Sequence, residues 1–186
     1  MGGCMETDYI KLVEELRAVI LQCYADIILL ETFDKLSDIE KGSSFIEFHL
    51  SYIVKMDLAL NVYKICIDKN KSANTIPKLV NCVNRDFKDD KMFEPIKKNK
   101  MDKLLENELK EMRSTFIAHL DINHNNKSIQ INSIKTVVMN AKEDYNKVCD
   151  CDKLPLLKGY RINDKELYMI KYEVSLGFGI MLAKIK

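Results

Sequence analysis

The sequence predicts an all-α fold, a single bundle of about five to six helices that spans residues 1–186. No glycine occurs between Gly42 and Gly159 and the chain has only three prolines, so the frequent tight turns of a β-sheet protein are missing. Apolar residues instead recur at steps of three and four, which places them on one face of a helix. No repeat or linker divides the chain, and 186 residues suit one domain.

The first half of the chain predicts three helices. The first covers about residues 7–33, with an apolar stripe at Val13, Leu16, Ile20, Cys23, Ile27 and Leu30. Ser44 and Glu47 form a capping-box pattern before the second, which runs to about Asp68. Its stripe comprises Phe45, Phe48, Tyr52, Met56, Ala59, Tyr63 and Ile67, widened by Ile46, Leu50, Ile53 and Val54. That width predicts burial on more than one side. A short third helix over 76–86 carries Pro77 in its first turn, where the missing N–H costs nothing.

The second half predicts three more. A helix over about 99–120 has its stripe at Leu105, Leu109, Met112, Phe116 and Leu120, and the Asn-rich segment 121–127 breaks it. Ser133 is predicted to cap a fifth helix that runs to about Val148. Asn163 and Glu166 are predicted to cap a sixth, with its stripe at Leu167, Ile170, Val174, Phe178, Met181 and Ile185. Gly177 and Gly179 lower helix propensity, and we expect them to admit a closely packed neighbour.

Charge and composition narrow the possible functions. With 29 basic and 28 acidic side chains the net charge is +1, so stable binding to DNA is not expected, whereas transient recognition of a folded RNA is compatible. The sequence lacks a signal-peptide pattern and any apolar stretch long enough to span a bilayer, which predicts a cytoplasmic protein with reduced thiols and no membrane partner. Cys149-x-Cys151 has no second pair, and phosphate loops are absent. We therefore expect neither a metal nor a cofactor.

The residues that suggest chemistry lie together at 113–121, which read Arg-Ser-Thr-Phe-Ile-Ala-His-Leu-Asp. This segment resembles the Arg-x(4–6)-His motif of the HEPN superfamily, and more closely its abortive-infection U-type (AbiU-like) branch. The order of helices before it is also similar to that branch. The resemblance implies an HEPN-like bundle, a homodimer, and an RNA-cleaving toxin or anti-phage protein, with an antitoxin protein as a further possible partner.

Arg113 and His119 are the predicted catalytic residues. They lie about 120° apart around an ideal helix, on opposite shoulders of the apolar stripe. Either the helix unwinds near His119, or a second copy meets this stripe and supplies the missing partner in a shared cleft. A neutral-range imidazole suits proton transfer, and a guanidinium suits the charge of a phosphorane. Metal-independent cleavage through the ribose 2′-OH would leave a 2′,3′-cyclic phosphate. Ser114, Asp121 and His124 are predicted supporting residues.

Two other interpretations stay open. Arg113 can form a surface ion pair with Glu106, Glu108 or Asp121, and His119 can be a histidine that the dipole favours at a helix C-terminus. Position 114 is Ser where many active relatives in the superfamily carry Asn, Asp or His. The alternative function is therefore a non-catalytic HEPN-like module for dimerisation or for binding a nucleotide or a protein.

Overall fold

The computed structural model describes residues 3–39, 45–68, 73–87, 103–118 and 131–185. All the regular structure in these ranges is helical, which confirms the predicted all-α class with its six α-helices. The elements are α1 (Gly3–Ile39), α2 (Phe45–Cys66), α3 (Ile76–Asp86), α4 (Lys103–Ala118), α5 (Ile131–Cys149), the short 3₁₀ helix η2 (Pro155–Tyr160) and α6 (Asp164–Ile185). The sequence did not predict η2.

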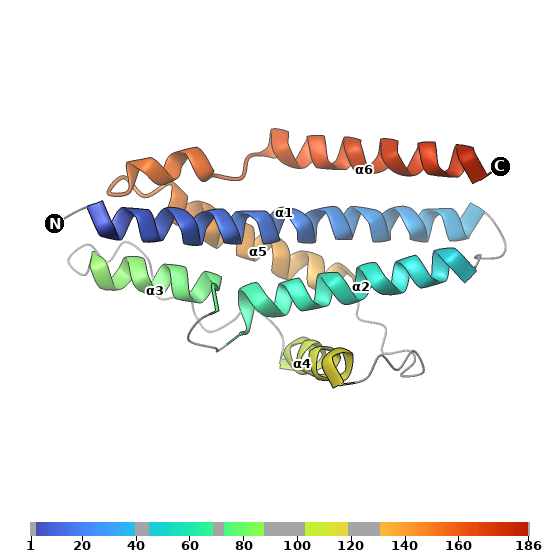
Figure 1. Ribbon diagram of the computed structural model, residues 1–186, viewed down its shortest axis with the longest axis horizontal. Helices are drawn as coiled ribbons and strands as arrows, with labels where there is room; N and C mark the ends of the chain where they lie inside the picture. Colours follow the sequence, from blue (N-terminus) through green and yellow to red (C-terminus); the bar gives the residue numbers. More distant parts are fainter. Residues whose placement is uncertain (1–2, 40–44, 69–72, 88–102, 119–130, 186) are drawn as a thin grey trace.

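Helix α1 is the centre of the bundle (Figure 1). It lies between α6 on one side and α2 and α3 on the other, and α5 crosses it obliquely. The six stripe residues predicted for this helix are all buried: Val13, Leu16, Ile20, Cys23, Ile27 and Leu30. They join one continuous apolar core with residues from α2, α3, α4, α5, η2 and α6. The periodicity of the first helix therefore identified the core correctly.

Helix α2 is buried on more than one side, as its wide stripe predicted, and Met56 and Ala59 of that stripe are buried. Leu58, Val62 and Ile65 are at most 1% exposed, and none of them belonged to the predicted stripe. Ile53, expected to widen the buried surface, is 50% exposed. In a helix that is apolar nearly all round, periodicity does not tell which face meets the core.

Capping residues mark where α3 and α6 begin. Thr75 caps α3, where its side-chain oxygen accepts a hydrogen bond from the Lys78 amide at 3.1 Å, and Pro77 lies in the first turn as predicted. At α6 the predicted capping box is formed: the Asn163 side chain accepts from the Glu166 amide at 3.0 Å, and Glu166 accepts from the Asn163 amide at 3.1 Å. The Thr75 cap and the capping box both satisfy amides that a helix start leaves without partners.

Two predictions about helix ends and glycines were wrong. Ser133 does not cap α5, because that helix begins two residues earlier at Ile131, whose side chain packs against the core. The packing of Ile131 against the core favours a helix that begins before Ser133. Gly177 does not admit a close neighbour, since nothing among the described residues lies within 4 Å of the position a Cβ would take, while the surroundings of Gly179 lie outside the described part of the chain. The capping pair Ser44 and Glu47 lies outside the described side chains.

The junction between α5 and α6 is held by buried hydrogen bonds. The Asn146 side chain donates to the Ile162 carbonyl at 2.9 Å and accepts from the Ile162 amide at 3.0 Å. The hydroxyl of Tyr145, which is fully buried, lies 3.2 Å from the Val13 carbonyl and 3.0 Å from the Tyr160 carbonyl. These polar groups tie α5 to α1 and to the η2 segment, so the chain reverses into α6 at a fixed position.

Candidate functional site

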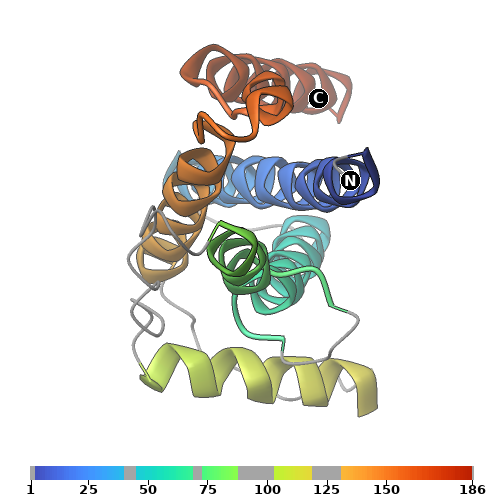
Figure 2. The same ribbon diagram turned by 90° about the vertical axis from the view of Figure 1, so that its left-hand side faces the viewer.

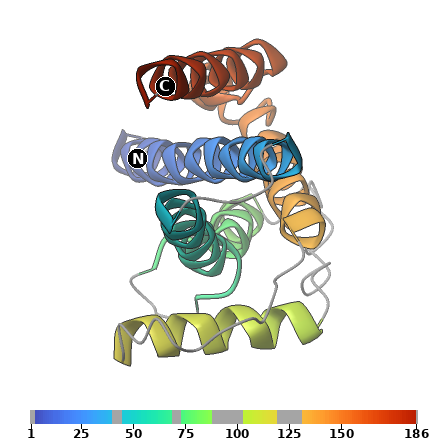
Figure 3. The same cartoon turned by 90° about the vertical axis from the view of Figure 1, so that its right-hand side faces the viewer.

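Helix α4 carries Arg113 and Ser114 of the predicted motif. It lies on one side of the bundle, beneath α2 and on the far side of α2 from α1 (Figures 2 and 3). Leu109 is fully buried and Leu105 is 6% exposed, so this side of α4 belongs to the core, with Met112 packed beside it. Among the described elements, its main contact is with α2.

Arg113 follows Leu109 by one helical turn and lies against α2. Its guanidinium carbon is 4.7 Å from the centre of the Tyr63 ring, and its Nη1 donates to the Tyr63 hydroxyl at 3.3 Å. A guanidinium that lies over an aromatic ring and donates to its hydroxyl is held in a defined position. Tyr63 is thus a site residue that the sequence assigned only to the apolar stripe of its helix.

No carboxylate in the described part of the chain lies within ion-pair distance of Arg113. Glu106, one of the partners considered for it, pairs with Lys110 instead. The interpretation of Arg113 as an ion pair with Glu106 or Glu108 is therefore wrong, while Asp121 lies outside the described residues. The planar donors of a guanidinium suit an anionic ligand such as a phosphate.

Ser114, the predicted supporting residue beside Arg113, uses its hydroxyl within its own helix. The Oγ donor lies 3.1 Å from the Lys110 carbonyl and 2.9 Å from the Glu111 carbonyl. The residue is exposed, and this back-bonding is the usual behaviour of a serine inside a helix. The structure therefore gives Ser114 a local role and no contact with Arg113.

The other predicted site residues, His119, Asp121 and His124, lie outside the described residues. Helix α4 is described to Ala118, the residue directly before His119. The described part of α4 nevertheless bears on the expected two-fold contact along its apolar stripe. Because Leu105 and Leu109 are buried in the core of their own chain, they are not available to a second copy.

A buried carboxyl between α1 and α2 was not identified from the sequence. Asp26 is 3% exposed, its Oδ1 accepts from Gln22 at 2.9 Å, and its Oδ2 is buried without a described hydrogen-bond partner. Burial, followed by the nearby Asp57 carboxylate, raises the pKa of Asp26 to about 7. The available signal was an Asp three residues after Cys23, beside the stripe of α1. Its sequence neighbours gave no reason to expect the opposing Asp57.

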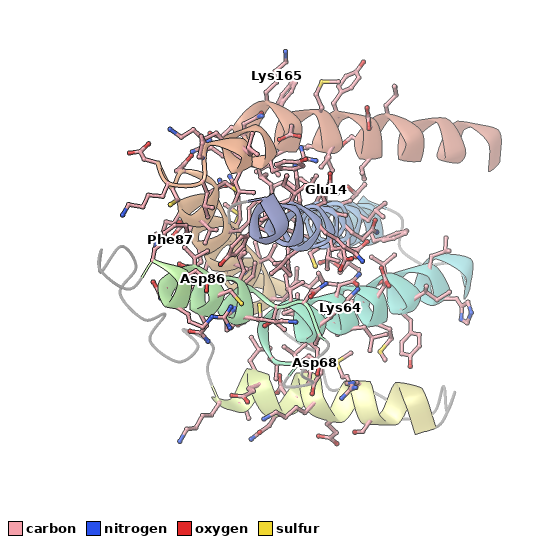
Figure 4. The ribbon with its side chains drawn as sticks, turned by 60° about the vertical axis from the view of Figure 1, so that its left-hand side comes forward. Glu14, Lys64, Asp68, Asp86, Phe87 and Lys165 are labelled. Carbon is pink, nitrogen blue, oxygen red and sulfur yellow. The ribbon has the colours of Figure 1, made fainter. Side chains whose placement is uncertain are left out.

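A second polar cluster fastens the amino end of α1 to the carboxyl end of α3, where Figure 4 labels Asp86. The Tyr9 hydroxyl donates to Asp86 at 2.6 Å, and Arg85 donates to the other oxygen at 2.9 Å. The Arg85 guanidinium, and then the Tyr9 hydroxyl, hold the pKa of Asp86 below its usual value. Unlike Arg113, Arg85 is committed to a carboxylate within the chain.

Comparison with protein-family models, with curated proteins and with solved structures finds no match to this chain. The described residues contain no group of three or more His, Cys, Asp or Glu side chains placed to hold a metal ion. Among the helices described, none is both long and apolar enough to cross a membrane. The five described cysteines are free thiols, and Cys23, Cys149 and Cys151 are buried.

Proposed function

We propose that this chain is a metal-independent endoribonuclease of the HEPN type, in which Arg113 binds the scissile phosphate and His119 transfers a proton. The observation that supports the proposal is the setting of Arg113, whose guanidinium lies over the Tyr63 ring and has no described carboxylate partner. A guanidinium that served only to neutralise a nearby carboxylate would lie beside one, as Arg85 does.

The chemistry requires three events at one phosphate. The ribose 2′-OH loses a proton and attacks phosphorus, and the bond to the 5′-oxygen breaks as that oxygen gains a proton. His119 suits either proton transfer, because imidazole titrates near neutral pH. The Arg113 fork suits the non-bridging oxygens, whose charge grows in the transition state. The products are a 2′,3′-cyclic phosphate and a free 5′-hydroxyl.

The test compares RNA cleavage in EDTA by wild type, Arg113→Ala and His119→Ala. Arg85→Ala is the matched control, because it removes an arginine whose partner is Asp86 and which is remote in sequence from the motif. We expect the first two variants to lose at least about a hundredfold in rate and the control to keep wild-type activity. Equal rates in all four proteins would refute the proposal.

A mixing experiment assigns the two residues to one chain or to two. Arg113→Ala and His119→Ala are each inactive by this proposal, and they are co-folded in equal amounts. If each site combines Arg113 of one copy with His119 of another, part of the activity returns. If one chain supplies both, none returns. The mixing experiment tests which chain supplies each residue, and the cleavage assay tests the reaction.

The resemblance stated for residues 113–121 also suggests a biological setting. We propose a cytoplasmic toxin or abortive-infection protein that acts on cellular RNA and is restrained by a partner protein. Induced expression of wild type is then expected to arrest growth, while His119→Ala is tolerated. Purification from the arrested cells, with sequencing of RNA ends that carry cyclic phosphates, would identify the target.

A non-catalytic nucleotide-binding module is the second candidate, and one observation favours it. The Ser114 hydroxyl is occupied by carbonyls of its own helix, at a position where active HEPN proteins often carry a larger polar side chain. This candidate predicts that wild type binds single-stranded RNA in a manner that depends on Arg113, yet leaves the RNA intact.

A further inference from the structure

The hydrogen bond between Arg113 and Tyr63 has a defined direction. Arg113 Nη1 donates to the Tyr63 hydroxyl at 3.3 Å, while the guanidinium carbon lies 4.7 Å from the centre of the ring. The hydroxyl oxygen is the acceptor in this contact, and a phenol that accepts one hydrogen bond keeps its own O–H as a donor. Among the described residues, no acceptor receives that hydrogen. The junction of α2 and α4 thus places a neutral donor beside a cationic one.

The two donor groups lie close enough together to bind one oxyanion. A guanidinium has five N–H donors, of which the Tyr63 hydroxyl accepts one. The two non-bridging oxygens of a phosphate diester are bonded to the same phosphorus, so an oxygen bound by Arg113 brings its neighbour within reach of the phenol. Donation from a cation also polarises the phenol, which makes its O–H a stronger donor. Both residues are partly exposed, which suits a ligand that enters from solution.

The described carboxylates near Arg113 in the sequence and in space do not pair with it. Glu106 is committed to an ion pair with a lysine of its own helix. Glu108 and Glu111 point about 140° and about 160° away from Arg113 around an ideal helix. Asp68, labelled in Figure 4 just beyond the end of α2, forms no ion pair with Arg113. Within the described part of the chain, the charge at this junction therefore favours an anion.

We infer that Tyr63 is a second phosphate ligand of this site, whose hydroxyl accepts from Arg113 and donates to a non-bridging oxygen of the phosphate diester that Arg113 binds. The inference rests on the proposed function for the identity of the ligand. Tyr63 transfers no proton in this arrangement. Its hydrogen bond strengthens as negative charge grows on the non-bridging oxygens, so Tyr63 contributes more to the rate of cleavage than to the affinity for RNA.

The main test is Tyr63→Phe, which keeps the ring beneath the guanidinium and removes the hydroxyl. Affinity is measured by fluorescence anisotropy with a DNA oligonucleotide, which lacks the 2′-OH and is not cleaved, and the rate is measured on RNA of the same sequence in EDTA. We expect the affinity to fall about threefold or more and the rate about tenfold or more. Tyr52→Phe, at another partly buried tyrosine of α2, is the matched control and should behave as wild type.

A double-mutant cycle separates direct binding of the phosphate from support of Arg113. If Tyr63 binds the phosphate itself, Tyr63→Phe lowers the affinity for the DNA oligonucleotide in the Arg113→Ala background as well as in wild type. If Tyr63 acts only by orienting Arg113, Tyr63→Phe has no effect once Arg113 is absent. That second result would overturn the inference. Thermal melting of each variant shows whether the fold is kept.

Nuclear magnetic resonance of protein labelled with ¹³C at the tyrosine Cζ atoms reports on the hydroxyl directly. The signal that is missing from Tyr63→Phe belongs to Tyr63. We expect the DNA oligonucleotide to shift this signal in wild type and the Tyr52 signal to stay in place. Inorganic phosphate is the comparison ligand. A Tyr63 signal that responds to inorganic phosphate at concentrations as low as those of the oligonucleotide would overturn the assignment to a phosphate diester.

Failure of this inference differs from failure of the proposed function. RNA cleavage that depends on Arg113, with a Tyr63→Phe variant equal to wild type in rate and affinity, would overturn the inference and leave the proposed ribonuclease in place. Binding of the oligonucleotide through Arg113 and Tyr63 without cleavage of RNA would support the phosphate site and refute the ribonuclease. A wild type that neither binds the oligonucleotide nor cleaves RNA would refute both.

Discussion

Helices α1 and α4 differ in how many neighbours hold them. Helix α1 packs against α2, α3, α5, α6 and η2, whereas the main contact of α4, among the described elements, is with α2. Fully buried residues recur along α1, while α4 buries Leu109 fully and Leu105 nearly so. Stability is therefore concentrated around α1, and Arg113 lies on a helix whose main contact among the described elements is with α2. Functional segments are often drawn from such less constrained parts of a fold.

The largest expected effect comes from the α1 core. Leu16→Ala should lower the free energy of unfolding by about 3 kcal/mol, because it leaves a cavity at a residue that is 1% exposed. Leu104→Ala on α4, where the side chain is 66% exposed, should change it by less than about 0.5 kcal/mol. Urea unfolding followed by circular dichroism measures both. Similar losses from the two variants would remove the distinction between the regions.

The buried amide of Asn146 should rank next. Asn146→Ala leaves the Ile162 amide and carbonyl without their described partners, at an expected cost of about 2 kcal/mol. Asn132→Ala, at an exposed position near the start of the same helix, is the control. A loss no greater than that of the control would show that the junction before α6 is not held as described.

The buried carboxyl of Asp26 makes the stability of the region around α1 depend on pH. Its pKa is about 7 in the folded chain against an ordinary value of 3.8, so folding is most favourable when Asp26 is protonated. Its contribution is full below about pH 4, falls as the pH rises to about 7, and stays low above that. Asp26→Asn should flatten this window and stabilise the protein at pH 8 by about 1 to 3 kcal/mol.

Thermal melting of wild type and Asp26→Asn between pH 4 and pH 8 measures that difference. Asp57→Asn is the companion variant, because it removes the negative neighbour and leaves Asp26 buried. It should stabilise the protein at pH 8 by less than Asp26→Asn does. A wild type and an Asp26→Asn variant whose melting curves shift in parallel over this range would contradict the assignment.

A smaller effect is expected where α4 meets α2. Tyr63→Leu keeps an apolar side chain and removes the ring beneath Arg113, which should lower stability by about 0.5 to 1 kcal/mol. Under the proposed function it should reduce RNA cleavage more than it reduces stability, because Arg113 loses its orientation. Tyr52→Leu, at another partly buried tyrosine of α2, is the control for helix packing.

The helices also differ in how well the sequence predicted their buried faces. The α1 stripe was predicted residue by residue, because its six residues recur at steps of three and four and all of them are buried. Helix α3 matches its predicted bounds because Thr75 and Pro77 mark its start. The predicted stripe of α2 was only partly right, because apolar residues beyond the stripe, Leu58, Val62 and Ile65, are buried as well. Helix α4 was predicted from its apolar stripe. The sequence did not predict that Leu105 and Leu109 of this stripe are buried in the core of their own chain.

Long-range contacts account for the remainder. Arg113 and Tyr63 lie 50 positions apart, and neither helix shows a pattern that names the other. The opposition of Asp26 and Asp57 likewise follows from how α1 and α2 pack. The sequence supplied Arg113 as a candidate from a short motif. Its aromatic support and its lack of a described carboxylate partner became visible only in the folded chain.

The most direct test of the functional account is the rate of RNA cleavage in EDTA by Arg113→Ala beside Arg85→Ala, with the cleaved ends identified chemically. We predict 2′,3′-cyclic phosphate ends from wild type and from Arg85→Ala, and a loss of at least about a hundredfold from Arg113→Ala. Cleavage by Arg113→Ala at the wild-type rate, or a purified wild type that leaves RNA intact, would contradict the account.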